Sequence, residues 1–67
     1  MTNTKQHALV TVTESDDASI LNVICAVLET SGQMLLIAPL TAVNGRMVPD
    51  RDDCHWIFDD QAKAYAA

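Results

Sequence analysis

Apolar and small polar residues alternate in the first patterned segment of the chain. In His7–Thr13, Val10 and Val12 fall on one face, whereas Thr11 and Thr13 fall on the other. A period of two is typical of a half-buried strand, and β-branched side chains favour extended backbone. The sequence therefore predicts a strand over residues 7–13.

The next segment carries a wide apolar stripe at helical spacing. Ser15 is a candidate N-cap, the helix dipole favours an acid such as Asp16 in the first turn, and Gly32 suits the position just past a helix end. These signals predict a helix from about Asp16 to about Thr30. The stripe along it consists of Ile20, Ile24, Val27 and Leu28.

A continuous apolar run, Met34–Leu40, follows the predicted helix. Pro39 argues against helix, and a strand without alternation is typical of burial on both faces. One helix can cover only one face, so a second copy of the chain is expected to cover the other. The sequence therefore predicts a homodimer. The predicted interface residues are Ile20, Ile24, Val27, Met34, Leu36 and Ala38.

The last third of the chain contains a hairpin signal and two short elements. Asn44-Gly45 lies between apolar flanks, and both central positions of a type I′ turn need positive φ. Residues 54–58 then read as a short strand, and 59–67 contain strong helix formers behind two aspartates. The expected fold class is α+β, a small single-domain βαββ(β)α sandwich with an antiparallel or mixed sheet and one main helix.

The segment Val10–Ile37 resembles the first half of an ACT-type regulatory domain. In that family a strand ends in a turn with Asp, and Gly-Ile-Leu then opens a helix. The matching residues are Thr13, Asp16, Ile20, Leu21, Val23, Val27, Leu28 and Gly32. Ala18-Ser19 stands where the family has Pro-Gly. The resemblance implies a βαβ unit and, as an alternative function, sensing of a small ligand near Glu14–Ser19 at a subunit interface.

Composition and charge exclude several classes of protein. The chain has 67 residues, of which 49% are apolar, so we expect one folded domain over 1–67, with a flexible polar tail at 1–6. Nine acidic and four basic side chains give a net charge of -5, which leaves no basic face for nucleic acid. No apolar run approaches the roughly 18 residues of a membrane span. We therefore expect a cytoplasmic protein with no nucleic-acid or membrane partner.

The residues that could carry chemistry are too few and too poorly spaced for a catalytic or metal site. Cys54 and His55 are adjacent, so on a strand they point to opposite faces. A structural zinc site usually has four ligands in paired spacings. Cys25 lies in an apolar segment, where a thiol is inert. We expect no cofactor, no metal and no enzymatic activity.

A binding surface is the strongest functional signal. Trp56 and Phe58 share one face of the predicted strand and Ile57 the other, so both rings are exposed if Ile57 is core. Alternatively, Trp56 itself fills the core. The nearby aspartates favour a basic partner. The predicted partner-binding residues are Asp50, Arg51, Asp52, Asp53, His55, Trp56 and Phe58.

These features predict a non-enzymatic protein that binds another protein and regulates or inhibits it, acting as a small acidic homodimer. Small acidic proteins of phages and other mobile elements, which occupy nucleic-acid-binding sites on host proteins, are the class-level analogy. The ACT-like ligand sensor is the alternative.

Overall fold

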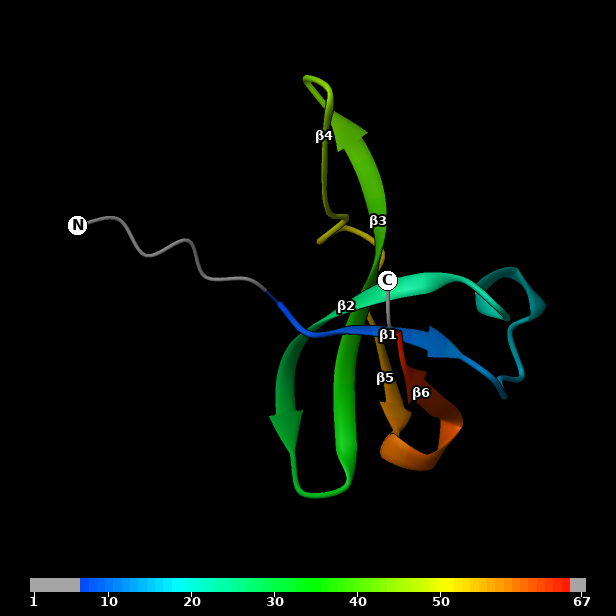
Figure 1. Cartoon of the computed structure of the whole chain (residues 1–67). Helices are drawn as coiled ribbons and strands as arrows, with labels where there is room; N and C mark the ends of the chain where they lie inside the picture. The colour runs from blue at the N-terminus through cyan, green and yellow to red at the C-terminus, as the bar shows by residue number, and fades with distance from the viewer. Residues whose placement is uncertain (1–6, 66–67) are drawn as a thin grey trace.

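The computed structural model describes residues 7–65 and contains a bent antiparallel sheet of six strands (Figure 1). The strands are β1 (Leu9–Val12), β2 (Ile24–Ser31), β3 (Met34–Val43), β4 (Arg46–Pro49), β5 (His55–Phe58) and β6 (Ala62–Ala64). Two single 3-10 turns interrupt them, η1 (Ala18–Ile20) and η2 (Asp59–Gln61), and no α-helix occurs in the described range. The predicted α+β class is therefore wrong, because the protein is all-β.

The predicted main helix over 16–30 is replaced by η1 and the long strand β2. Asn22 has a φ of 63°, which ends the short turn and redirects the chain into β2. β2 then pairs with β1 through Thr11↔Ile24 and Val10↔Cys25. Its β-branched residues lose little side-chain freedom in a strand, whereas a helix would restrict them. The βαβ unit implied by the ACT resemblance is not formed.

Gly32 does adopt a left-handed conformation, as the sequence indicates, but in a hairpin rather than at a helix end. Its φ is 59°, and Ser31 pairs with Met34 across the two-residue turn. β2 and β3 therefore form a direct hairpin, with a β-bulge between Val27 and Glu29. A bulge bends the strand that carries it, and on the N-terminal side of this bulge β2 pairs with β1 along one edge and β3 along the other.

β3 is the central strand, because it pairs with three other strands. β2 covers one edge of β3, while β5 and β4 pair in turn with the first and second halves of the other edge. Asn44 and Gly45 have φ values of 52° and 77°, so the predicted type of turn is confirmed. The β3–β4 hairpin projects from the body of the sheet as an arm (Figure 1).

The predicted C-terminal helix is also wrong. The chain makes the one turn η2 and then forms β6, which pairs with the outer edge of β1 through Thr11↔Lys63 and Val12↔Ala62. The amides of Thr13 and Glu14 both donate to the Gln61 carbonyl, at 2.8 and 3.2 Å. Sheet pairing thus overrides the helix propensity of an alanine-rich segment.

The core is small and aliphatic, as its composition indicates. It lies inside the bend of the sheet, where β1, β2, β3 and β5 turn their inner side chains toward η1. Its buried side chains are Val10, Val12, Ile20, Cys25, Ile37 and Ile57. No helix within residues 7–65 has both the length and the apolar character needed to cross a membrane.

Candidate protein-binding site

The alternation along β5 separates a buried residue from two exposed aromatic rings. Ile57 is 5% exposed and belongs to the core, whereas Trp56 is 48% and Phe58 54% exposed. The shared outer face of Trp56 and Phe58 is therefore confirmed, and the alternative that Trp56 fills the core is wrong. Two large aromatic rings that are about half exposed on one face of a strand are typical of binding anchors.

Two half-buried apolar residues of β3 lie next to these rings. Met34 is the cross-strand partner of Phe58, and Leu36 is the partner of Trp56. Directly opposed side chains in an antiparallel pair lie on the same side of the sheet and interact. We call these four residues, Met34, Leu36, Trp56 and Phe58, the aromatic face. It joins two residues predicted for the dimer interface with two predicted for partner binding.

The remaining predicted interface residues lie elsewhere. Ile20 and Ala38 are buried within the chain itself, while Ile24 and Val27 are half-buried on β2. The homodimer is expected only if a helix covers one face of β3 and leaves the other for a second copy, and the described residues contain no such helix. The homodimer stays a prediction, and its surviving candidate surface is the β3 half of the aromatic face.

The predicted acidic residues form a tight turn at the start of β5. The Asp50 amide donates to the Pro39 carbonyl at 2.8 Å, which anchors the turn to β3. The Asp50 carboxylate accepts from the Asp52 amide at 3.1 Å, and Asp53 Oδ1 lies 3.0 Å from His55 Nε2. Arg51, Asp52 and Asp53 are exposed. The turn therefore presents carboxylates to solvent beside the aromatic face.

A groove runs along β5 on the side away from β3. Its volume is about 310 Å³, and β5 forms one wall while the β1–η1 loop and Gln61 form the other. We call it the edge groove; its lining residues are Ser15, Asp16, Asp17, Ile20, His55, Trp56, Ile57, Phe58 and Gln61. Sequence reasoning missed the loop wall, because it placed these acids at the start of a helix.

Hydrogen bonds keep one acid of the groove ionised. The Asp17 carboxylate accepts from the Ser19 hydroxyl at 2.6 Å and from the Ser19 amide at 2.9 Å. These bonds hold the pKa of Asp17 below its usual value, with a smaller contribution from the nearby His55. His55 lines the same groove as Asp17 and is hydrogen-bonded to Asp53. The carboxylates of Asp16 and Asp17 give this wall of the groove a negative charge at neutral pH.

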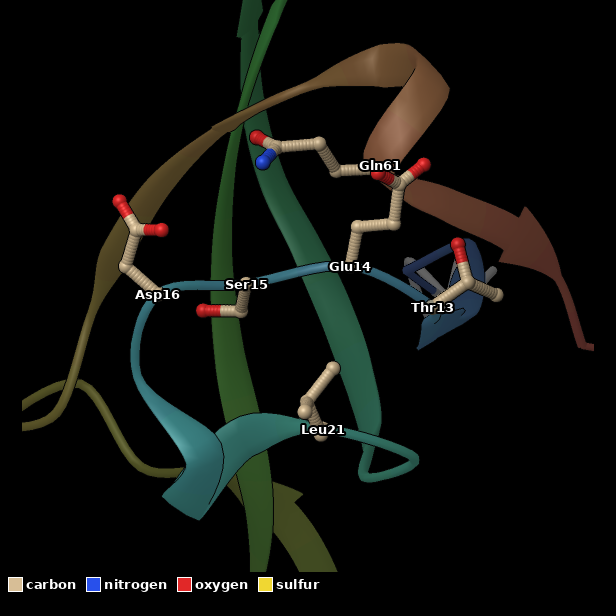
Figure 2. A pocket seen from close by; sticks show the side chains of 6 residues that line it. All are labelled: Thr13, Glu14, Ser15, Asp16, Leu21 and Gln61. Carbon is tan, nitrogen blue, oxygen red and sulfur yellow. The ribbon is translucent and has the colours of Figure 1, made fainter.

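A second hollow lies on the other side of the same loop. Its volume is about 340 Å³, and it is lined by Thr13, Glu14, Ser15, Asp16, Leu21 and Gln61. Figure 2 shows the Glu14 and Gln61 side chains on one side of the loop ribbon and Leu21 on the other. This hollow overlaps the ligand position implied by the ACT resemblance, but the helix N-terminus that the resemblance places there is not formed.

The two cysteines differ in their surroundings. Cys25 is fully buried, and that burial raises the pKa of its thiol. Cys54 is exposed, and its Sγ lies 3.2 Å from the Arg51 carbonyl oxygen. Within residues 7–65, no three His, Cys, Asp or Glu side chains are grouped so that they could hold a metal ion.

Comparison with known proteins assigns no family to this geometry. No protein-family model, curated protein or solved structure gives a significant match to the chain.

Proposed function

We propose that the protein is a non-enzymatic regulator or inhibitor that binds a basic surface of another protein. The observation that carries this proposal is the exposure of Trp56 and Phe58 on the strand whose middle residue, Ile57, is buried. Two of the three aromatic rings in the sequence lie on this surface, whereas the core contains none. Exposed rings on a rigid strand supply contact area with little loss of side-chain freedom.

Charge favours a cationic partner. The acids of the 50–53 turn lie at one end of β5, those of η2 at the other end, and Asp16 and Asp17 along its open edge. The chain has a net charge of -5. Such a rim accelerates encounter with a basic partner and disfavours an acidic one, and salt screens the effect. A basic nucleic-acid-binding site on a host protein has the required chemistry.

The aromatic face would serve both self-association and partner binding. A homodimer formed through Met34 and Leu36 would cover Trp56 and Phe58, because the two pairs are cross-strand neighbours. Dimer formation and partner binding through this face would therefore exclude each other. In this proposal the partner-binding form of the protein is the one in which the aromatic face is free.

The proposal is tested by quantitative capture of proteins from a cell lysate, with the wild-type chain and two alanine variants as bait. Trp56→Ala should lose a specific basic protein, and the capture should weaken as salt rises from about 50 to 300 mM. Met47→Ala is the matched control, because Met47 is 62% exposed but lies on the β3–β4 arm. Equal capture by wild type and Trp56→Ala would refute the proposed surface.

A further inference from the structure

The outer edge of β5 has an unused main-chain hydrogen-bonding position. The Asp59 amide donates to the Gln33 carbonyl at 2.8 Å, so residue 59 faces β3. The Phe58 amide points the other way and donates to Gln61 Oε1 at 2.8 Å. Successive residues of a strand alternate in this respect, so the N–H and C=O groups of Trp56 also point away from β3. No other strand in residues 7–65 pairs with β5.

This open position faces the edge groove. Trp56 and its neighbours on β5 form one wall of the groove, and the 15–17 loop forms the other. An exposed strand edge is a template for pairing with another extended chain. Gln61 closes the groove at one end by binding the Phe58 amide, which limits the template to a short segment around Trp56.

From this arrangement we infer that the groove binds an extended basic segment of the partner, which adds to the sheet as a strand along β5. The inference rests on the proposed function and specifies how the partner binds. Main-chain hydrogen bonds to Trp56 give the segment its register, and side chains on alternate positions contact the two sides of the sheet.

The two sides of the sheet require different side chains from such a strand. On the inner side the added strand meets Asp17 and His55, so Lys or Arg fits there. On the outer side it lies beside Trp56 and Phe58, where aliphatic side chains or the stem of an arginine pack on the rings. The recognised segment therefore alternates basic and apolar residues.

A second copy of this chain is a poorer occupant of the groove. Two β5 edges placed side by side would bring together the acidic loops of both copies, including Asp16 and Asp17 of each. Like charges opposed in this way disfavour association. The charge of the groove thus selects a cationic strand over self-pairing.

The test uses a synthetic chain in which the Trp56 amide nitrogen carries a methyl group. The methyl points away from β3, so the fold should be retained, and circular dichroism checks this. The probe is an eight-residue peptide that alternates Lys or Arg with Val or Leu, titrated by NMR against the full chain. We expect at least about tenfold weaker binding by the N-methylated chain, because the methyl removes one hydrogen bond and blocks strand approach.

Two control peptides and one variant make the outcome decisive. Replacing the basic residues by Glu, or placing Pro at the centre, should abolish binding, and Asp16→Asn/Asp17→Asn should weaken binding of the basic peptide. Equal binding of the proline peptide, unchanged binding by the N-methylated chain, or no binding of the basic peptide would overturn strand addition. A homodimer that forms through the β5 edge, seen as a doubled solution mass, would also overturn strand addition by the partner. If lysate capture still depends on Trp56 in these cases, the proposed function stands and only the mode of binding falls.

Discussion

The two sides of the β3–β5 ladder are built from alternating residues of the same two strands, yet only the inner side contains fully buried residues and only the outer side contains exposed aromatic rings. On the inner side, Ile37 is fully buried and Ile57 nearly so. On the outer side, Leu36 and Trp56 form a cross-strand pair that water reaches. Because the backbone is shared, the difference shows that hydrophobicity alone does not identify core residues. The outer residues are available for binding without disturbing the packing inside.

The largest expected effect is on stability and separates the two sides directly. Ile37→Ala should lower the free energy of unfolding by about 2–4 kcal/mol, because it removes buried methyl groups and leaves a cavity. Phe58→Ala should cost less than about 1 kcal/mol although it removes a larger side chain, since the ring is 54% exposed. Urea unfolding measures both. Comparable losses would mean that Phe58 is covered in solution, for example by a second copy.

The contrast between the two sides could be predicted from β5 but not from the rest of the sheet. Ile57 between two aromatic residues is a local alternation, and so is the Asn44-Gly45 turn, and both predictions hold. The spacing of Ile20, Ile24 and Val27 instead fits a helix, and the predicted helix is wrong. The spacing spans two different elements, because Ile20 ends η1 while Ile24 and Val27 lie on β2, and the left-handed residue Asn22 stands between them.

Long-range pairing explains the other failures. Lys63 lies opposite Thr11, so the strand character of β6 depends on a partner more than 50 residues away in the sequence. Local propensity favours helix in this alanine-rich segment and contains no information on that partner. The edge groove was missed for the same reason. Its two walls come from residues 15–17 and from β5, which only the closed sheet brings together.

The next largest expected effect is the difference in reaction rate between the two thiols, which tests the packing of the inner side without mutation. Cys25 is buried on the inner side of β2 with a raised pKa, whereas Cys54 is exposed. A thiol reagent at pH 8 should modify Cys54 at once and Cys25 only through opening of the fold, at least about a hundredfold more slowly for a stability near 3 kcal/mol. Mass spectrometry of timed samples gives both rates. Similar rates would show that the inner side opens readily and that Cys25 is not protected by its burial.

The same labelling experiment can be repeated on Ile37→Ala as its control. The cavity should accelerate modification of Cys25 and leave the rate at Cys54 unchanged, because Cys54 reacts from the folded state. Trp56→Ala should change neither rate appreciably. A Trp56→Ala chain that exposes Cys25 would place Trp56 among the stabilising residues and remove the distinction between the two sides.

The smallest expected effect is a change in the pKa of Asp17, on the loop that forms one wall of the edge groove. Because its pKa is lowered in the folded state by Ser19, Asp17 contributes stability that is fully present above its unfolded pKa and is lost as pH falls through the lower, folded pKa. Ser19→Ala should raise the pKa of Asp17 toward its usual value, as measured by NMR titration of the carboxyl carbon. Ser15→Ala is the control, since the Ser15 hydroxyl accepts from the Asp17 amide and does not touch the carboxylate. An unchanged pKa in Ser19→Ala would mean that this loop does not hold its charge as described, and that the acidic wall of the groove is less ordered than the strand it faces.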